Sequence, residues 1–453
     1  MPSPTLVWFR DDLRVADNPA LHAAVERGEP VVALYVLDEE SDGVRPLGGA
    51  AKWWLHGSLE ALARRLDELG GALVLRRGPA GRVVREVVDE IDAGLIVWNR
   101  RYGGPERDID TELKTALDES GREVHSLPGS LLTEPWHIET GAGEPFRVYS
   151  PFANALRSRF EHNPPRRPFA APDALPTGSS NAAAQSDDLG DWELLPTKPD
   201  WAGGLRETWQ PGEAAGRERL DAFLHDDLAG YAKGRDRPAA DATSLLSPYL
   251  RWGELSSPQV WHALARRTTE GAATFRRELM WREFAWHTLY AFPELHRRSW
   301  RQEYERFPWP PLDTANLVAW QSGRTGIPLV DAGMRELWHI GHMHNRIRMT
   351  TASFLVKHLL IDWRQGEEWF WDTLVDADAA SNPFNWQWVA GSGVDAAPYF
   401  RIFNPERQAE KFDPDGEYID RWVPDLGDAD YPSPIVDLKE GRRRALDAWE
   451  SVR

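Results

Sequence analysis

Residues that could bind a flat polar ligand are concentrated toward the C-terminal end of the chain. They are Asn345, Arg348, Met349, Asp376, Asp378, Asn382, Trp386 and Trp388. The first three are spaced i, i+3 and i+4, so they share one face of a helix. Polar groups on a face that is otherwise suited to burial cost free energy unless they are paired. A helical core with a few satisfied polar groups explains each residue singly, but the ordered set predicts a ligand site.

A second candidate cluster precedes this region and could bind phosphate. Tyr231 and Arg235 are followed by the run Thr243, Ser244, Leu245, Leu246 and Ser247, just before a predicted helix. Hydroxyl groups and unpaired backbone N–H groups at a helix start suit phosphate oxygens. An ordinary Ser or Thr N-cap is the alternative.

A third cluster lies in RRELMWREFAWH, where Glu278, Trp281 and Arg282 are spaced i, i+3 and i+4. Residues at this spacing are neighbours on a helix surface. A carboxylate beside an indole could bind a polar aromatic ligand. A solvated helix surface is the other interpretation.

The composition limits the classes of protein that the chain can be. With 453 residues, 42% of them hydrophobic, it should form two domains or one large domain with subdomains. It has no cysteine, which excludes disulfides, thiolate zinc sites and cysteine-ligated iron–sulfur clusters. No membrane span or secretory signal is visible, so we expect a cytoplasmic protein that is not attached to a membrane. The net charge of −18 argues against a general affinity for polyanions, so a nucleic-acid ligand would need basic residues gathered on one face.

The order of predicted elements indicates an α/β domain followed by a helical one. Short apolar runs at 5–9, 31–37, 72–76, 94–98 and 122–127 predict five strands, with helices at 50–69 and 79–91 between them. This pattern predicts a five-stranded parallel, Rossmann-like sheet in residues 1–130. The stretch 131–204 is rich in Pro, Ala, Ser and Gly and predicts an interdomain connector. From 205 to 453 we expect an all-α domain, with helical stretches at 213–224, 258–267, 275–289, 330–360 and 366–375.

The C-terminal motifs HNRIRM, NWQWVAGSG and PYFRIFNP, together with FRDDLR and DNPAL near the N-terminus, resemble the DNA photolyase and cryptochrome family. The resemblance runs from Leu6 to about Leu426. It is most similar to bacterial cyclobutane pyrimidine dimer photolyases of the branch near plant cryptochromes. In that family the N-terminal signature marks an antenna domain, which agrees with the absence of G-x-G-x-x-G after the first strand.

The resemblance implies that non-covalent FAD binds in the helical domain. Residues matching Tyr231 and TSLLS hold the pyrophosphate and ribityl chain, Arg348 pairs with Asp376 at the isoalloxazine ring, and Asp378 contacts the ring edge. Asn382 faces N5, where plant cryptochromes usually carry Asp. The residues assigned to FAD on this basis are Tyr231, Arg235, Thr243, Ser244, Leu245, Leu246, Ser247, Phe275, Arg282, Arg348, Asp376, Asp378 and Asn382.

The same resemblance implies that the reaction is the repair of damaged DNA. Glu278 would hydrogen-bond the dimerised bases and Trp281 would stack against them, with Asn345, Met349 and Trp388 completing the catalytic set. Family members that repair (6-4) photoproducts carry His at the position of Asn345, so Asn345 indicates cyclobutane dimers. Light would drive an electron from reduced FAD to a flipped-out dimer and back. We expect a monomer.

The resemblance also implies roles for other residues. Trp386 and Trp363 match the inner members of an electron relay, with Trp309 as the outer member and Trp338 or Trp371 as alternatives. Glu106 matches a pterin-contacting Glu, which favours methenyltetrahydrofolate as the antenna over a deazaflavin, a second flavin or none. Arg346, Arg401, Arg407 and Lys411 are expected at DNA phosphates. His339, His342, His344 and His358 are read as packing or substrate-lining residues, and no metal is expected.

Two rival functions follow from the residues. A cryptochrome-type photoreceptor would bind FAD in the same fold without repairing DNA. An acidic carbohydrate-active protein would also combine tryptophan platforms with paired carboxylates. The presence of both Glu278 and Trp281 favours the repair enzyme.

Overall fold

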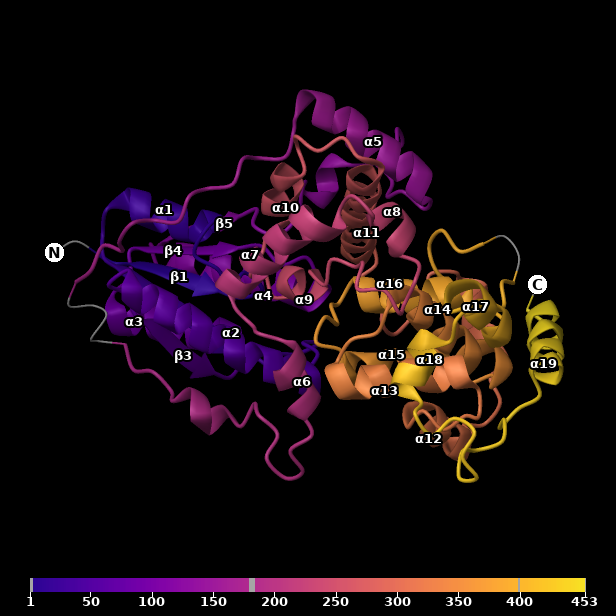
Figure 1. Ribbon diagram of the computed structural model, residues 1–453. Helices are drawn as coiled ribbons and strands as arrows, with labels where there is room; N and C mark the ends of the chain where they lie inside the picture. Colours follow the sequence, from indigo (N-terminus) through magenta and orange to yellow (C-terminus); the bar gives the residue numbers. More distant parts are fainter. Residues whose placement is uncertain (1–2, 179–183, 398–399, 453) are drawn as a thin grey trace.

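The computed structural model describes residues 3–178, 184–397 and 400–452. An α/β domain and a helical domain lie next to each other, and the segment that joins them runs along the outside (Figure 1). This arrangement confirms the predicted fold class. Residues 179–183 of the connector, and Pro398 and Tyr399 of the C-terminal motif, lie outside the described residues.

The N-terminal domain is built on a five-stranded parallel sheet with strand order β3-β2-β1-β4-β5. The strands are β1 (Thr5–Phe9), β2 (Val31–Leu37), β3 (Leu73–Arg77), β4 (Leu95–Asn99) and β5 (Glu123–Leu127). Every residue of β1, β2 and β4 is buried, as expected for parallel strands covered on both faces. The predicted strands are confirmed, each to within one residue at either end.

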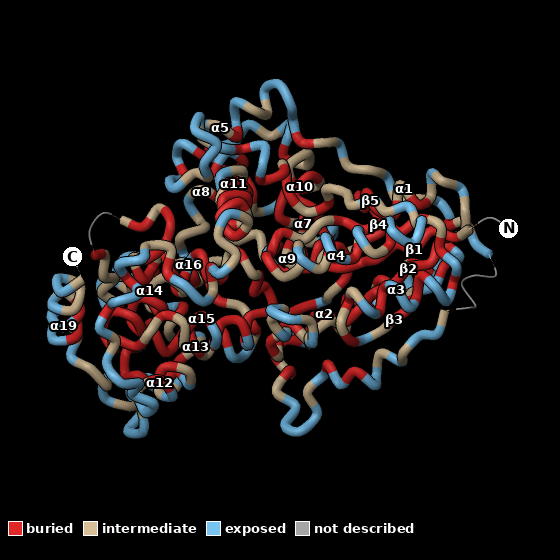
Figure 2. Tube along the Cα trace, turned by 180° about the vertical axis from the view of Figure 1, so that it is seen from behind, coloured by how far each residue is buried: buried red, intermediate tan, exposed pale blue. Residues whose placement is uncertain are grey.

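Helices cover both faces of this sheet. Helices α1 (Pro19–Arg27) and α2 (Gly49–Glu68) pack on the face that carries Val7 and Phe9. Helices α3 (Ala80–Ile91) and α4 (Gly104–Glu119) pack on the face that carries Leu6 and Trp8. Successive strand residues point to opposite faces, so one apolar strand supplies both cores. The sheet and the inner helix faces are accordingly buried, while the outer helix faces are exposed (Figure 2).

Residues 131–204 contain more regular structure than their composition predicts. They form η1 (Pro135–His137), α5 (Tyr149–His162), η3 (Leu189–Trp192) and the start of α6 (Gly203–Thr208). Helix α5 buries Tyr149, Phe152 and Leu156 and packs against α11 (Glu270–Ala291) of the helical domain. The prediction missed this helix because proline-rich stretches flank its few apolar residues. The domain boundaries at residues 130 and 204 remain a prediction.

The remaining chain is helical. Besides α11, its elements are α7 (Glu213–Ala222), η4 (Phe223–Asp227), α8 (Tyr231–Gly234), α9 (Ser247–Arg251), α10 (Ser257–Ala263), η5 (Gln302–Arg306), α12 (Thr314–Gln321), α13 (Pro328–Ile340), α14 (Asn345–Ser353), η6 (Phe354–His358), α15 (Trp363–Thr373), α16 (Ser381–Ala390), α17 (Pro405–Phe412), α18 (Glu417–Trp422) and α19 (Leu438–Glu450). A large apolar cluster made by α12, α13, α14, η6, α15 and α16 forms the core of this domain.

The single helical stretch predicted for 330–360 is wrong, because the chain breaks it at Gly341. This glycine ends α13 with φ of 64°, a left-handed conformation that glycine adopts at low cost. Helix α14 then begins at Asn345, with His344 as its N-cap accepting the N–H of Arg346. Asn345, Arg348 and Met349 therefore occupy the first turns of a short, separately oriented helix.

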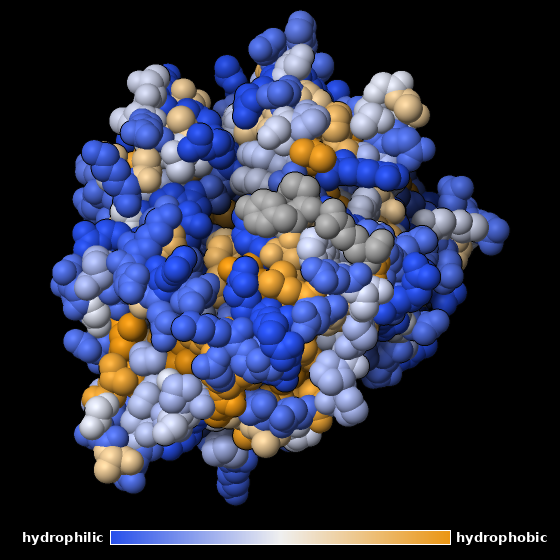
Figure 3. Space-filling view, turned by 90° about the vertical axis from the view of Figure 1, so that its right-hand side faces the viewer, coloured by the Kyte–Doolittle hydropathy of each residue, from blue (hydrophilic) through white to orange (hydrophobic). Residues whose placement is uncertain are grey.

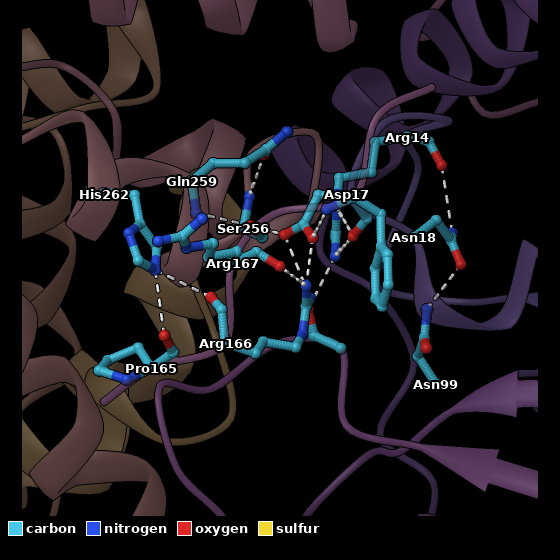
Figure 4. Close-up of polar contacts among 12 residues, drawn as sticks. Arg14, Asp17, Asn18, Asn99, Pro165, Arg166, Arg167, Ser256, Gln259 and His262 are labelled. Carbon is cyan, nitrogen blue, oxygen red and sulfur yellow. Dashed lines mark hydrogen bonds and ion pairs between the residues drawn. The ribbon is translucent and has the colours of Figure 1, made fainter. Parts of the chain in front are cut away.

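The two domains and the connector meet at Asp17, which is fully buried (Figure 4). Its carboxylate forms an ion pair with Arg166 of the connector and accepts the hydroxyl of Ser256 from the helical domain. It also accepts the N–H of Phe169 at 3.0 Å. A buried carboxylate is stable only when it is fully paired, so this contact requires all three segments to be in place.

Arg14 lies beside Asp17 and strengthens the same junction (Figure 4). Its guanidinium donates to the carbonyl oxygens of Asp17 and Gly129 at 2.7 Å and of Gly253 at 2.8 Å. Arg14 is itself fully buried. Hydrogen bonds from a buried cation to the α/β domain and to the helical domain fix the two domains relative to each other.

The outer surface is largely polar. Seen from the side of the helical domain it is mostly hydrophilic, with hydrophobic residues grouped in the lower middle part (Figure 3). Trp338 and Val318, each 53% exposed, are among the exposed large hydrophobic residues. Within the described ranges, every helix is too short or too polar to cross a membrane.

Glu254 is a second buried carboxyl between the domains. It accepts hydrogen bonds from the Ser58 hydroxyl at 2.5 Å, the Gly212 N–H at 2.6 Å and the Trp54 indole at 3.2 Å. Burial raises the pKa of Glu254 to about 8, although these hydrogen bonds act to lower it. The carboxyl is therefore largely protonated at neutral pH.

This raised pKa predicts a pH dependence of stability. The neutral carboxyl contributes stability below the ordinary pKa of 4.5, and that contribution is lost as the pH rises through about 8. We expect Glu254→Gln to remove up to about 1.4 kcal/mol per pH unit from the slope of unfolding free energy over this window. Thermal unfolding at several pH values measures the slope. An unchanged slope in the variant would contradict the assignment.

Candidate functional site

The three clusters found in the sequence meet at one cavity of about 490 Å³ in the helical domain. Its walls come from the loop before α9 and from α11, α14 and α16. The cavity is lined by every residue assigned above to FAD, by Glu278, Trp281, Asn345, Met349 and Trp388, and by Trp386. The structure thus brings these residues together, while their individual roles remain predictions.

The loop 243–247 forms one end of the cavity. Leu245 has a left-handed backbone with φ of 51°, and Leu246 after it is right-handed. Paired conformations of this kind turn successive N–H groups toward a common concavity that binds anions. Arg219 donates to the carbonyl oxygens of Thr243 at 2.9 Å and Ser244 at 2.8 Å, which fixes the loop. Holding a leucine in this conformation costs of order 1–3 kcal/mol, which is typical of functional sites.

Arg348 and Asp376 form an ion pair on the cavity wall. The Arg348 Nη2 donates to Oδ2 of Asp376 at 2.9 Å, and its Nε donates to the carbonyl oxygen of Met343 at 2.6 Å. Burial acts to raise the pKa of the Asp376 carboxyl, but Arg348 holds it below the ordinary value. Its second oxygen, Oδ1, is buried without a hydrogen-bond partner among the described residues. That oxygen is available to accept a hydrogen bond from a bound ligand.

Asp378 lies just before α16 and Asn382 lies in its first turn. Asp378 accepts the N–H groups of Ala380, at 2.9 Å, and of Ser381. Asn382 donates through Nδ2 to both the side chain and the carbonyl oxygen of Glu367, at 2.8 and 3.0 Å. Because the amide nitrogen is engaged by Glu367, the carboxamide oxygen of Asn382 is the group left for the cavity.

The residues assigned to the lesion lie on α11. Glu278 forms an ion pair with Arg235 across the cavity wall. Trp281 is stacked on Tyr149 of α5, with ring centroids 3.6 Å apart and planes 6° apart. Tyr149 is itself anchored by a hydrogen bond from its hydroxyl to the carbonyl oxygen of Arg277 at 3.1 Å. One face of the Trp281 ring is therefore covered and only the other is open to a base.

The tryptophans assigned to the electron relay lie in one apolar cluster. Trp386 and Trp363 are buried and Trp309 packs against the same cluster from its edge. Trp386 lies next to Phe370, with ring centroids 4.9 Å apart, and next to Trp320 at 6.2 Å. Of the three, only Trp386 lines the cavity.

The remaining predicted residues lie outside the cavity lining. Glu106 is in the first turn of α4 in the α/β domain. Arg346 pairs with Asp236 at 2.9 Å, and the Arg401 guanidinium lies 5.4 Å from the ring of Trp388. Arg407 and Lys411 are exposed on α17.

Tyr149 and Glu367, which support the site, were missed from the sequence. His342 and His344, which were expected to be packing or substrate-lining residues, lie in the cavity wall. Burial, together with the charge of Arg348, lowers the pKa of His342 to about 3, so its ring is neutral. Tyr149 and Glu367 carry no local signal, because their partners are distant in the sequence.

These features fit FAD. The backbone concavity of the 243–247 loop suits a pyrophosphate, the orphaned Oδ1 of Asp376 suits a ring N–H donor, and apolar residues such as Phe275 suit a planar ring. When bound, FAD supplies the light absorption and the transferable electron. The residues that would hold it are those assigned to FAD above.

The comparisons with known proteins agree with this site. Residues 5–173 match the family described as DNA photolyase, and residues 275–430 match the FAD binding domain of DNA photolyase. The deoxyribodipyrimidine photo-lyase of Agrobacterium fabrum is 48% identical and covers 100% of this chain and 98% of its own length. The structure of a class III photolyase from Agrobacterium tumefaciens superimposes with a TM-score of 0.95 at 47% identity, covering 100% of this chain and 98% of that one.

The chain is also similar to photoreceptors. Cryptochrome-1 of Arabidopsis thaliana is 34% identical over 99% of this chain and 70% of its own length. The fold and the flavin-type cavity therefore define a light-absorbing flavoprotein. The chain belongs to the DNA photolyase and cryptochrome family, which confirms the resemblance seen in the sequence.

The Arg348–Asp376 pair gives a direct test of the site. Arg348→Met leaves Asp376 buried without its counter-ion, so we expect a loss of up to about 3 kcal/mol in stability and less bound flavin. The double variant Arg348→Met/Asp376→Asn should regain stability but not flavin. Thermal unfolding and flavin absorbance per protein measure both quantities. Full flavin content in the single variant would exclude this pair from the flavin site.

Proposed function

We propose that this chain is a light-dependent deoxyribodipyrimidine photolyase that repairs cyclobutane pyrimidine dimers in DNA. The observation that supports it most directly is the pairing of Glu278 and Trp281 at the cavity of a chain that resembles photolyases over its full length. When bound and reduced, FAD would supply the light-driven electron that splits the flipped-out dimer, and the residues assigned to FAD above would hold it. The protein itself binds, orients and desolvates the lesion.

Trp281 serves as the stacking platform for the lesion. Tyr149 covers its other face, so the ring is already fixed before a base arrives and less conformational entropy is lost on binding. Flipping the dimer out of the duplex costs a few kcal/mol, least where the bases already stack poorly. Stacking on Trp281 offsets part of this free energy, by about 1–3 kcal/mol per base.

Glu278 is the acceptor that recognises the base edges. Its ion pair with Arg235 holds the carboxylate on the cavity wall before the substrate is present. Asn345 and Met349 line the same cavity from α14. Neither side chain is a proton donor of the kind that oxygen transfer in a (6-4) lesion needs, which favours the cyclobutane dimer.

DNA phosphates are proposed to contact a basic rim formed by Arg346, Arg401, Arg407 and Lys411. Arg407 and Lys411 are exposed on α17, and Arg401 lies over Trp388, which lines the cavity. The overall charge of −18 repels the rest of the duplex, so binding is confined to this rim and weakens with salt. We further propose that the protein acts as a cytoplasmic monomer.

Re-reduction of oxidised flavin is proposed to run through Trp386, Trp363 and Trp309 in that order. Trp386 touches the cavity and all three belong to or border one apolar cluster. Trp386 and Trp363 are buried, whereas Trp309 is only partly buried beside the cluster. Trp338 and Trp371 remain the alternatives for the outer position.

A repair assay separates this function from a cryptochrome-type photoreceptor. We expect purified protein with reduced flavin to restore dimer-containing oligonucleotides under blue light and not in the dark. Trp281→Ala should weaken binding to damaged DNA roughly ten- to a hundredfold while flavin is retained. Tyr149→Phe, which keeps the stacked ring, is the matched control. Absence of repair by wild-type protein with bound flavin would favour the photoreceptor.

The antenna is proposed to be methenyltetrahydrofolate, for which Glu106 stays the predicted contact and a second cavity offers a competing position. This cavity of about 660 Å³ is lined by apolar side chains including Trp338, Trp369 and Trp422. The rings of Trp338 and Trp369 are nearly parallel, with an angle of 7° between their planes and 6.0 Å between their centroids. Two nearly parallel indole rings on one cavity are suited to stack on a planar ligand.

The two antenna positions predict different effects of substitution on antenna binding. If the antenna lies in the second cavity, Trp338→Ala or Trp369→Ala should abolish binding of added methenyltetrahydrofolate, measured by absorbance and by energy transfer to flavin, without changing flavin content. Glu106→Gln should bind it normally. The reverse pattern would place the antenna at Glu106, and binding by all three variants would exclude both positions.

A further inference from the structure

A chain of contacts connects the α/β domain to the cavity through Arg45. This residue lies between β2 and α2, and its guanidinium pairs with both carboxylate oxygens of Glu367 on α15. The Nη1–Oε1 and Nη2–Oε2 distances are 2.8 and 2.9 Å. Arg45 also lies over the ring of Trp371, 4.2 Å from its centroid. Bidentate pairing fixes the orientation of the carboxylate as well as its position.

Glu367 in turn fixes the orientation of the Asn382 side chain. It is 2% exposed, and its Oε1 accepts the Asn382 amide nitrogen at 2.8 Å, while its own carbonyl oxygen accepts the same nitrogen at 3.0 Å. An ionised carboxylate can only accept hydrogen bonds, so it can hold the NH₂ group of an amide but not its oxygen. The oxygen of Asn382 is consequently the atom presented to the cavity.

The ionised state of Glu367 depends on Arg45. Burial raises the pKa of the Glu367 carboxyl, and the neighbouring charge of Glu368 acts in the same direction. Arg45 and the Asn382 amide lower it. Without Arg45 the carboxyl would protonate more readily, and a protonated carboxyl can donate to the amide oxygen. Asn382 could then turn around and present its NH₂ group to the cavity.

We propose that Arg45 is a positioning residue for the flavin: through Glu367 it holds Asn382 with its carboxamide oxygen toward the cofactor. This inference rests on the proposed placement of Asn382 opposite N5. An oxygen at that position accepts a hydrogen bond from a protonated N5, which only reduced flavin has. An NH₂ group would instead donate to the unprotonated N5 of oxidised flavin. Arg45 therefore favours the reduced cofactor that the repair reaction uses, although it belongs to the other domain.

The alternative is that Arg45 only holds the domains together. A neighbouring contact across the same interface offers a matched control, because the Gly49 N–H donates to Asp372 on α15 at 2.8 Å and nothing connects that bond to Asn382. Arg45→Met keeps an aliphatic stem over Trp371 but loses the ion pair. Asp372→Ala removes the control contact.

The test is the reduction equilibrium of bound flavin, followed spectroscopically against a redox dye, with flavin content and thermal unfolding recorded for each variant. Loss of one hydrogen bond to the reduced state predicts a shift of about tenfold toward oxidised flavin in Arg45→Met. That corresponds to about 30 mV for a two-electron couple. Arg45→Lys should shift less, and Asp372→Ala should leave the equilibrium unchanged.

A double variant separates positioning from direct charge effects. In an Asn382→Ala background, Arg45→Met should no longer shift the equilibrium. A shift that persists there would overturn the proposal, as would an equal shift in Asp372→Ala or no shift in Arg45→Met. If Arg45→Met does not fold, Arg45→Lys in both backgrounds gives the same comparison. Absence of flavin from the wild-type protein would instead contradict the FAD assignment.

Discussion

The arrangement of this molecule depends on the burial of Asp17. The carboxylate is fully buried and is compensated by groups from other parts of the chain, Arg166 and the Phe169 N–H of the connector and Ser256 of the helical domain. Leaving such a charge unpaired costs several kcal/mol, so docking of the domains is coupled to pairing of the charge. The same docking sets the segment before α2 against α15, where Arg45 reaches Glu367. Geometry at the cavity is thus controlled partly from outside the domain that contains it.

The side chains that line the cavity explain how a strongly acidic chain can bind an anionic ligand. Arg235, Arg282 and Arg348 line it. They equal in number its lining carboxylates, Glu278, Asp376 and Asp378, whereas the chain as a whole has a net charge of −18. Burial lowers the pKa of His342 and His344 to about 3 and about 4, so these imidazoles are neutral. Positive charge is therefore supplied by guanidinium groups, which stay protonated when buried, and the histidines contribute hydrogen-bonding atoms. Local charge, and not the total, decides what binds here.

Fold alone does not separate repair enzymes from photoreceptors in this family, since this chain is 48% identical to a photolyase and 34% identical to a cryptochrome. We propose that the distinction lies in a few side chains that line the cavity. In this chain Trp281 is backed by Tyr149 and Glu278 by Arg235, so both groups are held in place without substrate. A pre-positioned platform is useful for binding an extruded base and has no evident use in a protein that binds none.

The sequence by itself determined the strands, the order of the two domains and most of the polar residues that line the cavity. Periodicity identifies β-strands and helices because it reflects which face is buried, and long motifs identify a family because many positions must agree. Tertiary structure decided the rest. The break at Gly341 was hidden because apolar residues continue on both sides of it, and α5 was hidden because proline-rich stretches flank it. The stacking of Tyr149 on Trp281 and the contacts from Arg45 through Glu367 to Asn382 join residues far apart in the chain. Such contacts follow from how the domains pack, and no local pattern of residues specifies them.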